Sequence, residues 1–218
     1  MDEFSTLKSA YNNYDLDTNN KCRGDFLKKE RYTQGIRNFA WELILKYNIC
    51  SLPLDVFGLA NNLEILTVPY SRLAQLSGMT AMEIIQNYAL AAFYKSTPPE
   101  RIYYNDTLEH QGFLRFSIMH ELAHLLLQHL ADDAEREKEA KMLAARLLQP
   151  LIVLDACGVA SADELSALCG VSASAAGYRF KRLQERRAAG TIGMSRLERQ
   201  VGAQFAPFIV SYRKSKNR

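Results

Sequence analysis

The sequence contains no run of 18 or more apolar residues, although 48% of its 218 residues are hydrophobic. Without such a run we expect no membrane-spanning helix, and the composition is typical of a globular protein with one good-sized core. Residues 1–20 are polar and lack the apolar segment of a signal peptide. We therefore expect a cytoplasmic protein that makes no contact with a membrane.

Cysteine is also scarce, and the wide spacing of its positions excludes some kinds of site. The four cysteines, Cys22, Cys50, Cys157 and Cys169, are widely separated, and none belongs to a C-x-x-C pair. This pattern argues against a disulfide framework and against a cysteine-based zinc site, and it fits reduced thiols in a cytoplasm. The sequence has no internal repeat and no low-complexity tract.

Histidine is the third scarce residue, because the chain has only four. Two of them belong to the H-E-x-x-H motif His120-Glu121-Leu122-Ala123-His124, in a segment, 116–130, that predicts a helix. Residues four apart on a helix lie on one face, so both imidazoles can bind one zinc ion at about 2.0–2.1 Å. Glu121 is then the candidate catalytic base, which takes a proton from the attacking water.

The alternative is a surface helix with two chance histidines. The leucines around the motif argue against it, because they make the helix apolar on more than one side: Leu122, Leu125, Leu126 and Leu130. Polar side chains on a buried helix need partners, and a bound metal supplies one.

The motif lacks the third histidine of the metzincins, since Leu127 and Leu130 stand where that class has glycine and histidine. The other common third ligand is a carboxylate from a following helix. The nearby acidic candidates are Asp132, Asp133, Glu135, Glu137 and Glu139.

Helical periodicity distinguishes between these carboxylates. Residues 134–149 predict a helix that Pro150 ends, with an apolar stripe formed by Ala140, Leu143, Ala144, Leu147 and Leu148. Glu137 lies within about 50° of the centre of this stripe, Glu139 about 110° away, and Glu135 nearly opposite. The pattern favours Glu137 as third metal ligand over its alternative role, an ion pair with Lys141.

The two remaining histidines carry weaker predictions. His129 comes five residues after His124, so we expect it to point away from the metal and to be solvent-facing or packed. His110 stands in a polar stretch before the motif helix and is a candidate for lining the cleft. The oxyanion formed during amide hydrolysis needs a donor, for which Tyr178, His110 and Arg182 are candidates with none preferred.

The chain divides by pattern into three parts: an irregular or weakly helical N-terminal arm (1–30), a core (31–155) and a helical lobe with a basic tail (156–218). The core predicts helices at 35–47 and 56–61 and short strands at 63–68, 88–94 and 102–104. We expect an α+β fold with a minimal zincin-like core: a small sheet, the motif helix and the ligand-bearing helix. One sheet edge near the metal would bind an extended peptide by strand addition, but the sequence does not indicate which strand.

The C-terminal part differs in charge from the rest. Residues 161–218 hold 11 Lys and Arg against four Asp and Glu, whereas residues 1–160 hold 16 against 20. Ser161 and Glu164 predict a capping box for a helix that Gly170 ends, and Ser172 caps the next helix through Leu183. This helix-turn-helix-like segment either reads DNA or, as we favour, packs on the core and docks a partner. Residues 213–218 are predicted to be a disordered basic end.

The chain resembles the ImmA/IrrE family of bacterial and phage metallo-endopeptidases. That family has a short strand ending in Asn, an Arg-Phe-Thr/Ser segment, H-E-x-x-H, and E-x-E-A-N-x-F-A-x-x-L-L-x-P one helix later. The matching pieces are Ile102 to Asn105, Arg115 to Ser117, His120 to His124, and Glu137 to Pro150. Lys141 and Leu143 depart from the pattern, which has Asn and Phe there. The resemblance covers roughly residues 35–187.

The resemblance implies that Glu137 is the third metal ligand, beside His120 and His124. It also implies a cytoplasmic, zinc-dependent endopeptidase that cleaves a helix-turn-helix transcriptional repressor and so releases genes of a mobile element or a stress response. The same ligand types accept Mn²⁺ and iron. The alternative function is a non-catalytic, zinc-containing module that binds DNA or a repressor. A third interpretation, hydrolysis of small amides, lacks any deformylase-type segment to support it.

Overall fold

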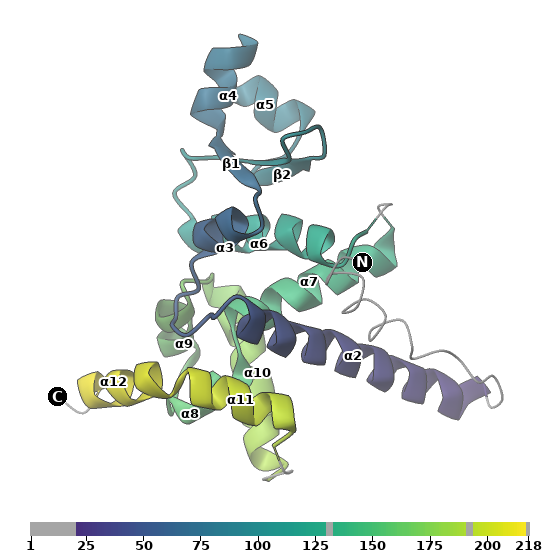
Figure 1. Ribbon diagram of the computed structural model, residues 1–218, viewed down its shortest axis with the longest axis vertical. Helices are drawn as coiled ribbons and strands as arrows, with labels where there is room; N and C mark the ends of the chain where they lie inside the picture. The colour runs from purple at the N-terminus through teal and green to yellow at the C-terminus, as the bar shows by residue number, and fades with distance from the viewer. Residues whose placement is uncertain (1–20, 130–132, 191–193, 217–218) are drawn as a thin grey trace.

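The computed structural model describes residues 21–129, 133–190 and 194–216, with side chains from Tyr32 onward. The fold is α+β, as predicted, and consists mostly of helices that pack on one another, with one small three-stranded sheet that contacts α3, α4 and α6 (Figure 1). Residues 1–20 of the predicted N-terminal arm lie outside the described residues. Its remainder, 21–30, forms the first part of a long helix, α2 (Lys21–Lys46), which also contains most of the helix predicted at 35–47.

The sheet has the strand order β1-β3-β2. Strand β3 (Arg101–Tyr104) is central; it pairs in parallel with β1 (Leu66–Pro69) and antiparallel with β2 (Ala92–Lys95). All three predicted strands exist, but the first two begin three or four residues later than predicted. The predicted first residues of these strands cap helices instead: Leu63 is the C-cap of α3 (Val56–Asn62), and Tyr88 is the C-cap of α5 (Ala81–Asn87).

Two helices that the sequence did not predict, α4 (Tyr70–Ser77) and α5, connect β1 to β2. They form the end of the molecule beyond the sheet, at the top of Figure 1. Each has a local cause: Gly78 ends α4 in the left-handed conformation, and Thr80 and Glu83 form a capping box that begins α5. These two helices have only eight and seven residues, and over such short segments the periodicity of apolar residues does not distinguish a helix from a strand.

The two helices that carry the motifs pack against each other. Helix α6 (Gln111–Leu126) bears H-E-x-x-H and begins five residues before the predicted start, while position 130 of the predicted helix lies outside the described part of the chain. Helix α7 (Ala134–Leu148) buries the predicted stripe and ends before Pro150. The apolar side chains of α6 lie in the core, where Ile118, Met119 and Leu122 are fully buried.

The C-terminal third is helical: α8 (Leu151–Ala156), α9 (Ala162–Cys169), α10 (Ala173–Ala188), α11 (Arg196–Gln204) and α12 (Ala206–Lys216). Ser161 and Ser172 cap α9 and α10, and Gly170 ends α9, as predicted. The prediction of a disordered basic end was wrong for residues 213–216, which belong to α12. The Lys216 ammonium bonds to the Glu164 carboxylate (2.6 Å) and the Gly158 carbonyl (2.8 Å), so tertiary contacts order this segment.

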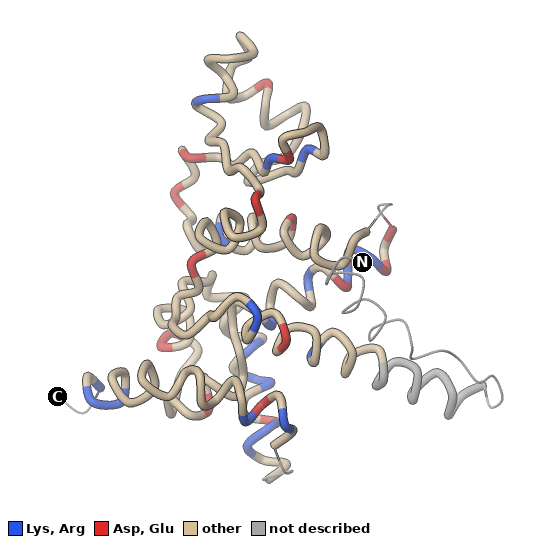
Figure 2. The backbone as a smooth tube through the Cα atoms, viewed as in Figure 1, with Lys and Arg blue, Asp and Glu red and all other residues tan. Residues whose placement is uncertain are grey.

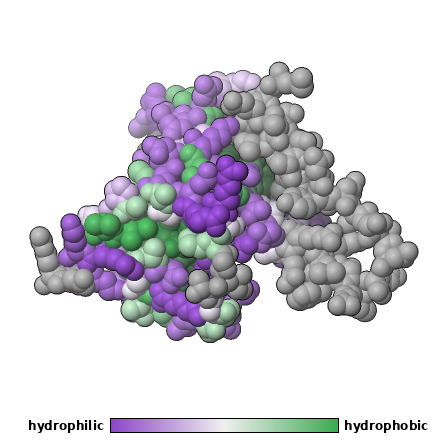
Figure 3. All heavy atoms as spheres, turned by 60° about the horizontal axis from the view of Figure 1, so that its bottom comes forward, coloured by the Kyte–Doolittle hydropathy of each residue, from purple (hydrophilic) through white to green (hydrophobic). Residues whose placement is uncertain are grey.

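One hydrophobic cluster joins the helices on both sides of residue 155, from Ile44 on α2 through Leu147 on α7 to Phe205 at the end of α11. The Gln204 side-chain amide also bonds to the backbone carbonyls of Ile44 (2.9 Å) and Ile49 (2.7 Å). The domain boundaries at 30 and 155 stay predictions. On the face that Figure 3 shows, hydrophobic patches lie among mostly hydrophilic residues. No helix among the described residues combines the length and apolarity that crossing a membrane requires.

Candidate metal centre

Helices α6 and α7 bring three predicted ligands together. The Nε2 atoms of His120 and His124 are 3.2 Å apart, and Glu137 Oε1 lies 3.1 Å from His124 Nε2 and 3.5 Å from His120 Nε2. Within the described ranges, these residues form the one group of three or more His, Cys, Asp or Glu whose ligand atoms converge on a metal-sized site. The convergence follows from the four-residue spacing on α6 and from Glu137 facing α6.

The spacing of these atoms fits a tetrahedral metal ion. Ligand atoms at about 2.0–2.1 Å from a tetrahedral zinc ion lie about 3.3–3.4 Å from one another. The three measured distances, 3.1, 3.2 and 3.5 Å, lie around that value. The histidine side chains are 14% and 15% exposed and Glu137 is 37% exposed, so one side of the group is open to solvent. An open side is what separates catalytic metal sites from closed structural ones.

The other acidic candidates have different roles. The Asp133 carboxylate caps α7 by accepting hydrogen bonds from the backbone amides of Glu135 and Arg136. Glu135 is exposed, and Asp132 lies outside the described residues. The cap at Asp133 fixes where α7 begins, and this places Glu137 in the first turn with its carboxylate beside the histidines.

Glu137 acts as both a candidate ligand and an ion-pair partner. Its Oε1 faces the histidines, while its Oε2 lies 3.0 Å from the Lys141 ammonium. The two roles that seemed alternatives in the sequence are compatible because a carboxylate has two oxygens. Partial burial acts to raise the pKa of Glu137, but the Lys141 hydrogen bond and the neighbouring histidines outweigh it and the pKa is lowered. Burial and the nearby His124 lower the pKa of His120, which favours the neutral imidazole that binds metals.

His129 is packed against the site, although it is not part of the ligand group. Its Nδ1 lies 3.0 Å from His124 Nδ1, and its Nε2 lies 2.8 Å from Glu139 Oε2. The side chain is only 6% exposed. The helix ends at Leu126, and Gln128 adopts a left-handed φ of 54°, so the chain turns back and brings His129 beside His124. A helical projection of the sequence does not show this contact.

Only one tautomer of His124 leaves Nε2 free to bind a metal. In it, the Nδ1–H of His124 donates to His129 Nδ1, and the Nε2–H of His129 in turn donates to the Glu139 carboxylate. The Nδ1 atom of His124 and both ring nitrogens of His129 then have suitable partners while both imidazoles stay neutral. Such a carboxylate–histidine contact behind a ligand fixes the orientation and basicity of its ring. The sequence contained a partial signal, since Glu139 is the second glutamate of the E-x-E segment.

Glu121, on α6, contacts the edge of the sheet. Its Oε2 accepts a hydrogen bond from the Tyr94 backbone amide at 3.1 Å. Tyr94 belongs to β2, an outer strand of the sheet, and its amide points to Glu121 instead of to β3. The strand next to the site, which the sequence did not indicate, is therefore β2. The negative charge of Glu121 adds to burial in raising the pKa of Tyr70.

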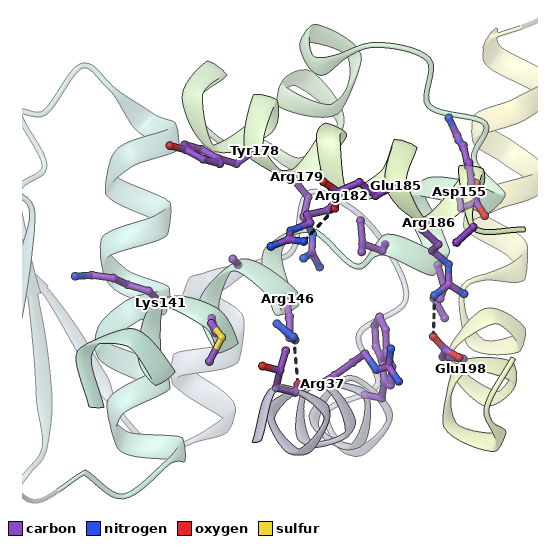
Figure 4. Close-up of a pocket in the computed structure, with 18 of the residues that line it drawn as sticks. Arg37, Lys141, Arg146, Asp155, Tyr178, Arg179, Arg182, Glu185, Arg186 and Glu198 are labelled. Carbon is purple, nitrogen blue, oxygen red and sulfur yellow. Dashed lines mark hydrogen bonds and ion pairs between the residues drawn. The ribbon is translucent and has the colours of Figure 1, made fainter. Parts of the chain in front are cut away.

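The three oxyanion candidates lie in different places. His110 is exposed immediately before α6. Tyr178 and Arg182, both on α10, line a cleft whose wall also includes Glu137 (Figure 4). Tyr178 is 80% exposed. His110 is not part of that lining, and which residue donates to the oxyanion stays a prediction.

The chain matches a protein-family model described as the IrrE N-terminal-like domain, Peptidase_M78, over residues 75–181. The matched segment contains α5, β2, β3, α6, α7, α8, α9 and the first half of α10, and so all the residues of the candidate metal centre. No curated protein and no solved structure matches the chain.

Proposed function

Because the chain belongs to the ImmA/IrrE family of metallopeptidases through residues 75–181, we propose that it is a zinc-dependent endopeptidase. Its substrate in this proposal is a helix-turn-helix transcriptional repressor, whose cleavage releases the genes it represses. The observation that carries the proposal is the convergence of His120, His124 and Glu137, with Glu121 following His120 on the same helix.

In the proposed mechanism, His120, His124 and Glu137 hold the metal ion. When bound, the ion supplies Lewis-acid chemistry, which polarises the scissile carbonyl and acidifies water. The Glu121 carboxylate takes a proton from the attacking water and later delivers it to the leaving amine. His129 and Glu139 orient the His124 ring through the contacts at 3.0 and 2.8 Å.

The substrate chain is proposed to add to the free edge of β2. This edge carries the Tyr94 amide that contacts Glu121, so a strand bound along it passes beside the catalytic base. Main-chain hydrogen bonds to an edge strand bind extended peptides of many sequences. Specificity for one repressor must then come from contacts outside this edge.

The direct test is to mix the purified, zinc-loaded protein with the helix-turn-helix repressor encoded nearest its gene and to follow fragments by mass spectrometry. We expect cleavage at one site. Glu121→Gln should slow cleavage by about 100-fold or more while the zinc content stays unchanged, because only the proton acceptor is lost. Glu135→Gln, an exposed carboxylate on α7, is the matched control and should cleave like the wild type.

Other outcomes have defined meanings. Cleavage by Glu121→Gln at the wild-type rate would contradict the mechanism. A tight complex with the repressor and no cleavage by any form would favour the non-catalytic, zinc-containing binding module instead. Reconstitution with Zn²⁺ or Mn²⁺ before the assay identifies the metal that supports activity, since the ligand set accepts both.

A further inference from the structure

A large cleft adjoins the candidate metal centre on the side away from the sheet. Helices α2, α7, α8, α10 and α11 form its walls, and its volume is about 1740 Å³. Glu137, one of the three candidate ligands, belongs to the wall, so the cleft reaches the metal group at this residue. Lys141, which pairs with Glu137, lines the same cleft (Figure 4). Sites for small molecules measure about 300–1000 Å³. The size therefore suits a longer ligand, such as an extended stretch of polymer.

The cleft is strongly basic. Its lining includes eight Lys and Arg side chains but only four carboxylates. Figure 2 shows the basic positions grouped along α10 and the neighbouring part of α7. Each of the four carboxylates already lies within 3.2 Å of a Lys or Arg nitrogen of the lining; they are Glu137, Asp155, Glu185 and Glu198. Four cations of the lining form no ion pair with a carboxylate in the described part of the chain: Arg37, Lys138, Arg146 and Arg179.

The three arginines of this set bond only to neutral oxygens. Arg146 donates to the Thr33 carbonyl (3.2 Å), Arg179 Nε donates to the Gln149 carbonyl (2.7 Å), and Arg37 donates to the Gln34 side-chain oxygen. Arg37 Nε is buried with no hydrogen-bond partner. A guanidinium has five N–H donors, so each arginine keeps donors for a ligand.

These guanidinium groups lie close enough to repel one another. Burial lowers the pKa of Arg146 to about 10, and the charges of Arg37 and Arg182 act in the same direction. Burial likewise lowers the pKa of Arg179 to about 9, with Arg146 and Arg182 adding to the effect. Both groups remain cations at neutral pH. A bound anion would reduce this electrostatic repulsion between the guanidinium groups.

We propose that this cleft binds an acidic segment of the polypeptide substrate, with carboxylates of that segment on Arg37, Arg146 and Arg179. A planar guanidinium binds a carboxylate through two parallel hydrogen bonds, which gives direction as well as affinity. The inference rests on the proposed function, because Glu137 belongs both to the ligand group and to the cleft wall, and a chain held at the metal for cleavage would reach the cleft there. It supplies the specificity that strand addition to β2 does not.

The test measures binding separately from cleavage. Fluorescence anisotropy follows a labelled peptide of Glu, Gly and Ser and a matched peptide with Gln in place of each Glu, both titrated with Glu121→Gln protein. We expect the acidic peptide to bind about tenfold or more tightly than its amide counterpart. Because carboxylates also bind metals, the titration is repeated after chelation, and the preference should persist.

Variants identify the residues responsible. Arg146→Gln and Arg179→Gln should each weaken binding of the acidic peptide about tenfold and leave the amide peptide unchanged. Lys138→Gln changes an exposed side chain and so tests the charge without threatening the fold. Arg213→Gln, on α12 and outside the cleft, is the control and should bind like the parent protein. Thermal unfolding confirms that each variant is folded.

Equal affinity for the two peptides, or loss of the preference on chelation, would overturn the proposal. So would displacement of the acidic peptide by single-stranded oligodeoxythymidine at a lower concentration than the unlabelled peptide itself, because the cleft would then be a nucleic-acid site. Failure of the proposed function gives a different result: acidic peptides bind selectively, but the zinc-loaded wild type cleaves neither them nor the repressor.

Discussion

At the scale of single residues, the two ring nitrogens of His124 have different partners. Nε2 faces His120 and Glu137, whereas Nδ1 contacts His129, which in turn contacts Glu139. The orientation of the ring is therefore fixed by contacts within the protein on the side opposite the metal group. A ligand that is already oriented loses less conformational freedom on binding, so these contacts should contribute to metal affinity.

Substituting His129→Ala should weaken zinc binding about 10- to 100-fold, because His124 loses the contact that fixes its tautomer and orientation. Competition with a chromogenic zinc chelator measures the change. The exposed His110→Ala is the control, since it removes a histidine that contacts no ligand. An unchanged affinity in His129→Ala would show that the contact plays no part in holding the metal.

At the scale of elements, backbone packing fixes the position of the motif helix. A Cβ on Gly112, in the first turn of α6, would lie 2.6 Å from the backbone of Val171 and Ser172 in the turn between α9 and α10. Such a distance is shorter than van der Waals contact, so only glycine fits there. The helix-turn-helix-like segment is thus packed with its turn against α6.

Substituting Gly112→Ala should destabilise the protein by about 1–3 kcal/mol, because a backbone contact cannot be relieved by side-chain rotation. Gly177→Ala, inside α10, is the matched change: nothing lies within 4 Å of its added Cβ, so it should stabilise the protein by about 1 kcal/mol. Urea unfolding measures both. Equal effects of the two substitutions would contradict the close packing of α6 on the α9–α10 turn.

The start of α11 provides a test by pH. The buried Glu198 accepts a hydrogen bond from the Ser195 amide (2.9 Å) and pairs with Arg186 (3.2 Å). Burial acts to raise the pKa of Glu198, but these contacts, and the charge of Arg37, lower it below 4.5. The unfolded state therefore binds the proton more readily, and the stability from this group, present above pH 4.5, is lost as the pH falls through the folded-state pKa.

Glu198→Gln keeps the capping oxygen and removes the charge. At pH 7 it should lower the free energy of unfolding by about 1 kcal/mol, and the gap to the wild type should shrink below pH 4.5. Urea midpoints at several pH values give the comparison, with exposed Glu135→Gln as the control for general acid unfolding. A gap that stays constant down to low pH would contradict the role of the charge.

At the scale of the whole molecule, the metal group joins two core helices whose apolar faces pack together. Helices α6 and α7 contribute fully buried residues such as Leu122 and Leu143 to one hydrophobic cluster that also includes α2 and α11. A metal bound across α6 and α7 binds the folded state and not the unfolded chain. Metal binding and folding are therefore linked.

Zinc should raise the unfolding temperature, with a stabilisation of about 2.7 kcal/mol when free zinc is at 100 times its dissociation constant. Differential scanning fluorimetry with zinc and with a chelator measures this shift. Glu137→Ala should abolish the zinc-dependent shift, because it removes a ligand that joins α7 to α6. If zinc raises the unfolding temperature of Glu137→Ala as much as that of the wild type, another residue must be the third ligand.

The sequence by itself determined the local features: the H-E-x-x-H helix, the buried stripe of α7 that selected Glu137, and the serine caps of α9 and α10. These depend on helical periodicity and on hydrogen bonds between neighbours in the chain, so the order of residues contains them.

Only the tertiary structure decided the rest. The position of β2 beside Glu121, the contact of His129 with His124, the helix at residues 213–216 and the basic cleft all depend on which elements meet in space. Arg37, Arg146 and Arg179 stand on three helices far apart in the sequence, and no spacing rule relates them. Long-range packing places such groups together, because it minimises exposed apolar surface over the whole chain and not within one segment.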